Sequence, residues 1–116
     1  MTAPLVVGGP DGMTIHAVAT YRGCAVTVRG DVDADTAPGL RTCLLEVLGR
    51  TGVTTVDLDL AGVTFLNSAG LTALVVAHRA AQRSGRMLSV RTGTSRAVVR
   101  PLQITGLFGV LTVVDG

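Results

Sequence analysis

The middle of the chain constrains its fold most strongly, because a strand pattern there gives way directly to a helix pattern. Val56, Leu58 and Leu60 alternate with polar residues, which is typical of a strand with one dry and one wet face. The polar positions include two aspartates, whose burial without partners would be costly, so we expect part of the sheet to have an open face. The apolar residues that follow recur at helical spacing. We therefore predict a strand over residues 55–60 and a helix over residues 69–84.

The turn between these two elements reads Phe65-Leu-Asn-Ser-Ala-Gly-Leu71 and contains a serine flanked by small residues. We predict that the hydroxyl of Ser68 is presented where the strand ends and the helix begins. Two roles fit this position. The hydroxyl can cap the helix by accepting a backbone N–H two or three residues on. Alternatively, it accepts a phosphoryl group, whose charge is tolerated at a helix N-terminus but displaces a docked partner.

The rest of the chain follows the same two periodicities. Gly23 is expected to supply the positive φ of a hairpin, and Asp35 or Thr36 to begin the helix after it. Pro101 is expected to end a later helix near Arg100. Outside the central unit, the predicted elements are strands over residues 14–20 and 24–29, a helix over 36–50, a strand over 87–91, a helix over 95–103 and a strand over 110–114.

This order predicts a single α/β domain. Its sheet should be mixed and mostly parallel, with an antiparallel N-terminal hairpin and about three to four helices. A chain of 116 residues is long enough for one domain with a real core. We expect residues 1–12, which end in a cluster of Gly and Pro, to be flexible or to lie against a sheet edge, and residues 13–116 to form the domain.

Composition argues against two classes of partner. The chain has ten Arg and no Lys, scattered without a block, and aromatic residues make up only 3%. Nucleic-acid binding is therefore not expected. The longest clean apolar run near the centre, residues 74–77, is far shorter than the ~20 residues that a membrane helix needs, so membrane insertion is not expected either.

The two cysteines and the first residues bear on localisation. Cys24 and Cys43 are isolated, and the chain shows no basic-then-apolar leader. We expect reduced thiols in a cytoplasmic protein.

Three aspartates superficially open a calcium loop. Asp31, Asp33 and Asp35 have the right spacing. The sixth and twelfth loop positions, however, carry Thr36 and Thr42 in place of the required Gly and Glu. We predict no metal here, and interpret the aspartates as part of a strand-to-helix turn that favours the positive end of the helix. Asp33 remains a candidate partner contact.

Signatures of catalysis are missing from the sequence. It contains no Gly-x-Ser-x-Gly elbow, no phosphate loop and no dinucleotide fingerprint. His78 falls on the largely apolar helix face, which favours a core position over a ligand role. A small hydrolase using Ser68 would lack a base placed by motif. We predict no catalytic residue and no cofactor.

The helix over residues 69–84 also has an outer face. Ala73, Val76 and Ala80 are expected to project away from its apolar stripe, beginning one turn beyond Ser68. This patch is either a contact surface for a partner or a set of good helix formers on an ordinary surface.

Several segments resemble the STAS domain, the family named for sulphate transporters and anti-sigma factor antagonists. Residues 56–74 are similar to its central signature, in which a strand leads through an apolar pair and an Asp-Ser-x-Gly turn into a helix. Gly30-Asp-Val-Asp33 with residues 36–38 resembles the Gly-Glu-Leu-Asp turn, and residues 102–108 resemble the closing Leu-x-x-x-Gly-Leu. The resemblance covers roughly residues 13–114. Asn67 stands where the family usually has Asp, which removes a carboxylate beside the hydroxyl.

The resemblance implies a regulatory function. In stand-alone bacterial members, an anti-sigma factor that is also a serine kinase phosphorylates this serine. The unphosphorylated antagonist binds the anti-sigma factor and frees the sigma factor, and a phosphatase reverses the modification. Carried onto this chain, the phosphorylation site is Ser68, and the partner-binding residues are Asp33, Asn67, Ser68, Ala69, Gly70, Ala73 and Val76.

A second function stays open from the same resemblance. Related STAS domains serve as cytosolic accessory subunits or scaffolds of transporters and lipid-transport complexes. The transporter type is normally fused to its membrane part, and the sequence shows neither a membrane segment nor a further domain. This favours the antagonist.

Overall fold

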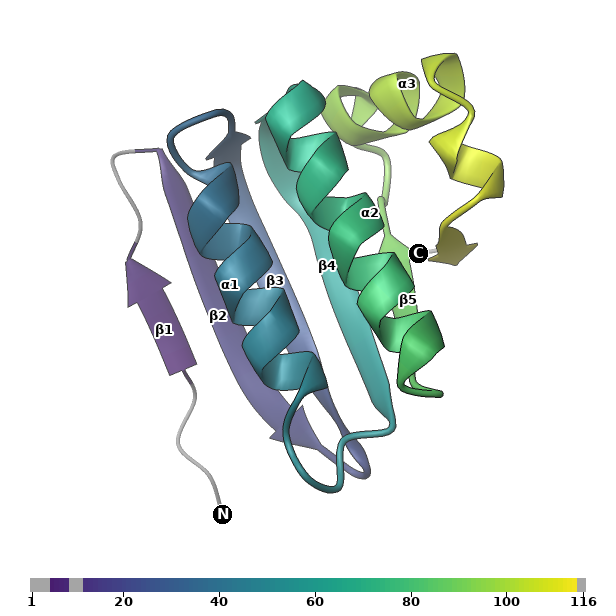
Figure 1. Cartoon of the computed structure of the whole chain (residues 1–116). Helices are drawn as coiled ribbons and strands as arrows, with labels where there is room; N and C mark the ends of the chain where they lie inside the picture. The colour runs from purple at the N-terminus through teal and green to yellow at the C-terminus, as the bar shows by residue number, and fades with distance from the viewer. Residues whose placement is uncertain (1–4, 9–11, 115–116) are drawn as a thin grey trace.

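The computed structural model describes residues 5–8 and 12–114 of the chain. Within them, six strands form one sheet in chain order, β1-β2-β3-β4-β5-β6 (Figure 1). The strands β1, β2 and β3 pair antiparallel, and β3 to β6 pair parallel. The elements are β1 (Leu5–Gly8), β2 (Met13–Thr20), β3 (Gly23–Val32), α1 (Ala37–Leu48), β4 (Thr55–Leu66), α2 (Ser68–Arg83), β5 (Met87–Arg91), α3 (Arg96–Ile104), the 3₁₀ helix η1 (Leu107–Gly109) and β6 (Thr112–Val114).

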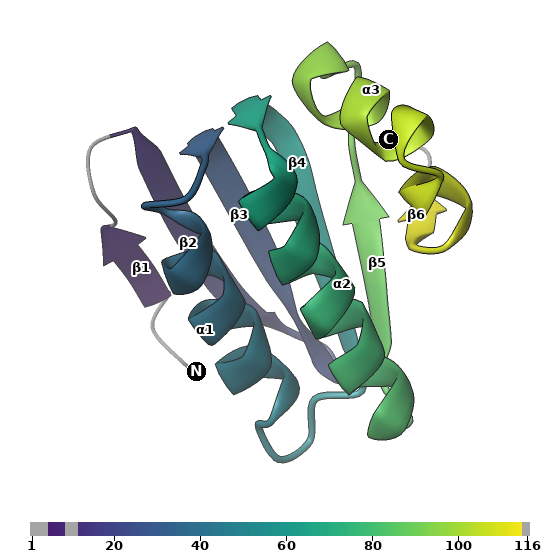
Figure 2. The same ribbon diagram turned by 45° about the horizontal axis from the view of Figure 1, so that its top comes forward.

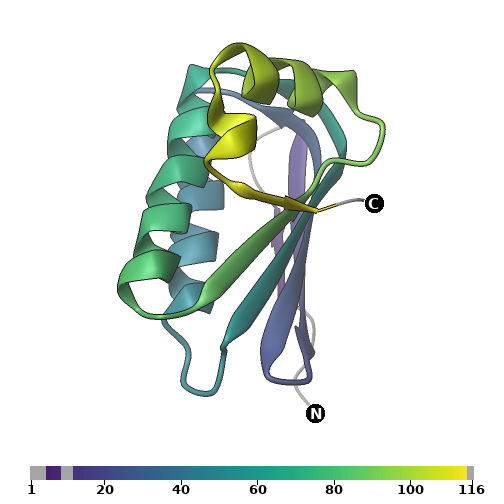
Figure 3. The same cartoon turned by 90° about the vertical axis from the view of Figure 1, so that its right-hand side faces the viewer.

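The predicted class, α/β with a mostly parallel sheet and an antiparallel hairpin, is confirmed. Helices α1 and α2 cover one face of the sheet, and in the described part of the chain no helix covers the opposite face (Figure 3). Helix α3 lies beyond the end at which β4 and β5 finish (Figure 2). The segment of residues 5–8 runs as an edge strand along β2, and the other positions before Gly12 lie outside the described residues.

The core fills the space between the sheet and the two covering helices. It is aliphatic, as a chain with so few aromatic residues requires. The alternation in β4 behaves as predicted, since Val56, Leu58 and Leu60 are buried while Asp57 is exposed and accepts a hydrogen bond from the hydroxyl of Ser89. The largest fully buried side chains are Ile15, Leu40, Leu44, Leu58, Leu60, Leu74, Leu102, Val26, Val28, Val32, Val47 and Val56.

The cysteines and one histidine belong to this core. Cys24 and Cys43 are buried and free of a disulfide. Burial is the main reason why the pKa of each thiol is raised. His78 is buried as well, which confirms the core position predicted for it.

The hairpin between β2 and β3 differs from the prediction. The residue with positive φ is Arg22, at 61°, and not Gly23. Gly23 is required for a different reason, because a Cβ atom there would overlap the carbonyl oxygen of Thr55 on the neighbouring parallel strand. The glycine therefore serves strand pairing rather than turn geometry.

Several helix and strand boundaries also differ from the prediction, most of all in β4, which continues from residue 60 to Leu66. Helix α1 ends at Leu48, and α3 continues through Pro101 to Ile104. Proline removes only one intrahelical donor, and the next turn still forms, since the Thr105 N–H donates to the carbonyl of Pro101. The last strand, β6, begins at Thr112 because η1 occupies the residues before it.

None of the helices within the described residues combines the length and the apolar character that crossing a bilayer requires.

Candidate functional site

Asn67 is the residue that caps α2. Its backbone is extended, with φ −103° and ψ −171°. Its Oδ1 atom accepts hydrogen bonds from the backbone N–H groups of Ala69, at 3.0 Å, and Gly70, at 3.3 Å. The capping role considered for Ser68 is therefore wrong, because the helix begins one residue earlier than that role needs.

Ser68 is the first residue of α2 and is exposed. Its carbonyl accepts a hydrogen bond from the Thr72 hydroxyl at 2.9 Å. Its own hydroxyl has no hydrogen-bond partner within residues 5–8 and 12–114. The prediction that this hydroxyl is presented at the strand-to-helix junction is confirmed.

The neighbouring turn, between β3 and α1, is organised by Asp33. Its Oδ1 atom accepts hydrogen bonds from the N–H groups of Asp35, at 3.0 Å, and Thr36, at 3.1 Å. The Thr36 hydroxyl accepts from the Asp33 N–H at 2.9 Å and lies 2.9 Å from the carbonyl of Asp31, to which it donates. Thr36 is the N-cap residue of α1, one of the two residues predicted to begin this helix, but its side chain makes no capping hydrogen bond. The half-buried Asp33 carboxylate instead closes the turn that precedes the helix.

Direct contacts hold the two junctions together. The Asn67 N–H donates to the carbonyl of Val32 at 3.2 Å. The Thr64 hydroxyl donates to Oδ1 of Asp31 at 2.6 Å. Asp33 and Ser68 therefore lie at the same end of the sheet, just beyond the ends of the adjacent parallel strands β3 and β4.

Gly70 fixes how closely α2 approaches the sheet. A Cβ atom at this position would lie 2.5 Å from Cδ1 of Leu66 and 2.8 Å from Cγ1 of Val32. Gly70 is itself buried. Its observed role is thus packing, a role that the motif alone does not reveal.

The prediction of an outer patch on α2 is wrong for Ala73. Ala73 is only 3% exposed and belongs to the core, whereas Val76 and Ala80 are half-buried. The reason is that α2 packs against α1 as well as against the sheet, so its buried face is wider than its own periodicity indicates.

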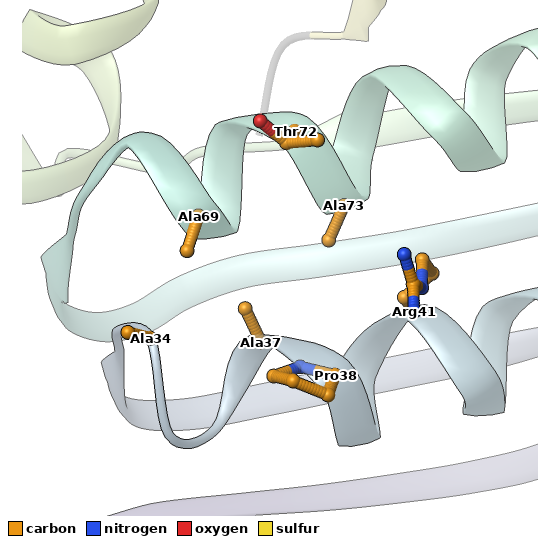
Figure 4. A pocket seen from close by; sticks show the side chains of 7 residues that line it. All are labelled: Ala34, Ala37, Pro38, Arg41, Ala69, Thr72 and Ala73. Carbon is orange, nitrogen blue, oxygen red and sulfur yellow. The ribbon is translucent and has the colours of Figure 1, made fainter.

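Small side chains between the two helices leave a groove beside Ser68. Figure 4 shows Ala69 and Ala73 of α2 directed toward Ala37 of α1. The hollow measures about 260 Å³, and we call it the α1–α2 groove. Arg41 lies at one end of the groove and was not predicted from the sequence. The only sequence signal for the groove is the spacing of small residues on both helices. The groove is lined by Ala34, Ala37, Pro38, Arg41, Ala69, Thr72 and Ala73.

A family of known domains matches almost the whole of this architecture. The family described as "Mlab, STAS domain" matches residues 15–113. The chain belongs to the STAS domain family. The junction that carries Ser68 is thus the strand-to-helix turn of a STAS domain, with Asn67 as its cap.

Solved structures with the same fold include anti-sigma factor antagonists. An antagonist from Mycobacterium paratuberculosis is 27% identical, with a TM-score of 0.75, over 92% of this chain and 89% of that chain. The anti-sigma factor antagonist SpoIIAA in its unphosphorylated form is 16% identical, with a TM-score of 0.72, over 98% and 88%. The Bacillus cell fate determinant SpoIIAA in its phosphorylated form is 15% identical, with a TM-score of 0.67, over 98% and 91%. At these lower identities the likeness to SpoIIAA concerns the fold.

Proposed function

We propose that this STAS domain is an anti-sigma factor antagonist that phosphorylation of Ser68 switches off. The observation that carries the proposal is the exposed Ser68 hydroxyl, which has no hydrogen-bond partner among the described residues because Asn67 caps the helix. The likeness to the Mycobacterium paratuberculosis antagonist supports the same class of function. The partner is an anti-sigma factor with serine kinase activity, in the cytoplasm, and the output is sigma-factor-dependent transcription.

The domain contributes an acceptor to the reaction and the kinase contributes the catalysis. Oγ of Ser68 forms a bond to the γ-phosphorus of ATP, the bond from that phosphorus to the bridging oxygen breaks, and ADP leaves. The hydroxyl proton passes to a base of the kinase. A phosphatase later hydrolyses the ester and restores the hydroxyl.

The charge of the phosphoryl group explains the switch. A phosphoserine carries about −1.5 to −2 charges near pH 7. At the first position of α2 it lies beside the positive end of the helix, so the fold tolerates it. The surface around Ser68 and Asp33 nevertheless becomes more negative, and the partner loses its fit.

Asn67 is compatible with this switch. Helix capping requires an acceptor oxygen, and the amide of asparagine supplies one as well as a carboxylate does. The neutral side chain leaves the phosphoryl group without a like charge at the adjacent position.

Mass spectrometry tests the modification. The purified protein is incubated with the anti-sigma factor kinase of the same organism and ATP, and we expect a mass increase of one phosphate on Ser68. The matched controls are Ser68→Ala, which should take up none, and Thr51→Ala, at an exposed hydroxyl in the loop between α1 and β4, which should be phosphorylated normally. No transfer to the wild type, or equal transfer to Ser68→Ala, would contradict the proposal.

A binding measurement tests the consequence. We expect Ser68→Asp to keep the fold and to weaken binding of the anti-sigma factor by about 1 kcal/mol or more. Ser84→Asp, at the other end of α2, is the charge-matched control and should bind normally. If the chain instead co-purifies with a membrane transport complex and no kinase, the accessory-subunit function replaces this one.

A further inference from the structure

We propose that the α1–α2 groove receives one apolar side chain of the anti-sigma factor, and that a carboxylate close to that side chain in the partner pairs with Arg41. This inference rests on the proposed function, because it names where and by what chemistry the partner docks beside Ser68.

The size of the groove selects the kind of occupant. Its volume is about 260 Å³. Sites for small molecules and cofactors run from about 300 to 1,000 Å³ and enclose most of their ligand. This groove is smaller and open along its length between two helices, as Figure 4 shows, so a single side chain from a protein partner fits it better than a cofactor does.

The lining of the groove selects an apolar group. Five of its seven lining residues are Ala or Pro. The hydroxyl of Thr72 is already engaged, since it donates to the carbonyl of Ser68 at 2.9 Å. A polar group entering between the two helices would lose water without gaining hydrogen bonds from the alanines, which is unfavourable. An aliphatic side chain gains apolar contact at no such cost.

Arg41 supplies the charged half of the recognition. It is exposed, and no ion pair of its side chain is present within the described residues. A guanidinium in this position is suited to pair with a carboxylate through two parallel hydrogen bonds. An acidic residue of the partner is thus the complementary group.

The charges at the two ends of the groove give the docking a direction. Ala34 marks one end and Arg41 the other (Figure 4). Ala34 lies between Asp33 and Asp35, so that end is negative while the Arg41 end is positive. A partner segment with an acidic residue at one end and a basic or neutral residue at the other fits in one orientation only.

The position of the groove links docking to the switch. Ala69, in its lining, is covalently adjacent to Ser68. A partner segment seated in the groove therefore passes beside the phosphorylation site. A phosphoryl group on Ser68 would lie toward the Ala34 end of the groove, so it would act on the part of the segment that passes this end, through its bulk and the cost of desolvating its charge, and not on the carboxylate at Arg41.

Two groove variants and two matched controls test the proposal by calorimetric titration with the purified anti-sigma factor kinase. Ala69→Leu fills the groove from a half-buried position, and Arg41→Glu reverses its charge. We expect each of these two variants to raise the Kd by about tenfold or more, as the loss of a central interface contact does. Ala19→Leu on β2 and Arg79→Glu on α2 make the same changes at exposed positions outside the groove and should leave the Kd within about twofold of wild type. Where Ala69→Leu lowers the Tm, Ala34→Leu at the exposed end replaces it.

The outcomes separate this inference from the proposed function. If the wild type neither binds the kinase nor accepts phosphate on Ser68, the proposed function and the groove proposal are both contradicted. If the wild type binds and is phosphorylated while Ala69→Leu and Arg41→Glu bind as tightly as it does, only the groove proposal is overturned.

A photo-crosslinker at position 72, on the rim of the groove, identifies the occupant. We expect the crosslinked peptide to come from the anti-sigma factor and to contain an aliphatic residue with Asp or Glu within one helical turn. Replacing that acid by its amide should weaken wild-type binding and leave Arg41→Ala binding unchanged. A crosslink to a second copy of this chain, or to a peptide without an acid, overturns the proposal.

Discussion

The β3–α1 and β4–α2 junctions lie side by side at one end of the sheet. Each contains a side-chain hydroxyl, and the two hydroxyls have opposite surroundings. Residues 33–36 connect β3 to α1. Thr36 among them is 1% exposed, and its hydroxyl is hydrogen-bonded to two backbone groups. Asn67 alone connects β4 to α2, and the hydroxyl that follows it, on Ser68, is exposed and unpaired within the described residues. One hydroxyl holds the fold together, and the other is left available for chemistry.

The difference arises from whether a side chain caps the helix. At the first junction the Thr36 side chain makes no capping hydrogen bond, and its hydroxyl and the Asp33 carboxylate together close the turn that precedes the helix. At the second, Asn67 caps from the adjacent position and needs no help. A short connection with an efficient cap thus frees the next residue, and Gly70 lets that connection be short by allowing α2 to touch Val32.

The largest expected effect comes from removing that close approach. Gly70→Ala places a methyl group against Leu66 and Val32, and overpacking of this kind costs up to about 3 kcal/mol of the free energy of unfolding. The matched control is Gly39→Ala in α1, where a Cβ meets nothing within 4 Å, and it should stabilise by about 0.5–1 kcal/mol. Urea unfolding followed by circular dichroism measures both. Equal effects of the two substitutions would show that the second junction is not tightly packed.

A direct exchange of the two hydroxyls gives the next largest effect. Thr36→Val leaves the half-buried Asp33 N–H without the acceptor that the Thr36 hydroxyl provides, and should cost about 2 kcal/mol of the free energy of unfolding. Ser68→Ala removes a hydroxyl that bonds nothing in the described part of the chain, and should change that free energy by less than about 0.5 kcal/mol. The comparison of the two junctions breaks down if Ser68→Ala destabilises the fold as much as Thr36→Val does.

Periodicity is sufficient to predict most of this fold from the sequence. The alternation of Val56, Leu58 and Leu60, followed by helical spacing, fixes a strand and a helix, because each pattern buries apolar residues only in that conformation. The sequence also places Ser68 at the junction. These features depend on residues close together in the chain.

Features that depend on distant neighbours could not be predicted. Asn67 and Ser68 are both good caps, and only the backbone angles decide between them. The burial of Ala73 depends on where α1 packs, and the need for Gly23 depends on Thr55 of another strand. The importance of Arg41 arises in the same way, since the groove exists only once two helices lie together.

The smallest expected effect concerns the cap that frees Ser68. Asn67→Ala leaves the N–H groups of Ala69 and Gly70 without their acceptor and should cost about 1 kcal/mol of the free energy of unfolding, measured in urea. Asn67→Asp keeps an acceptor oxygen at the same place, and its charge is favourable at a helix N-terminus, so stability should stay within about 0.5 kcal/mol of wild type or rise slightly.

The same Asn67→Asp variant places a negative charge beside the Ser68 phosphoryl group. The second pKa of that phosphate, followed by phosphorus NMR, should therefore be higher than in the wild type, because a neighbouring negative charge disfavours the dianion. If Asn67→Ala lowers the free energy of unfolding while Asn67→Asp leaves the phosphate pKa unchanged, the side chain at position 67 and the phosphoryl group on Ser68 point apart. Folding and regulation would then depend on separate groups within a single turn.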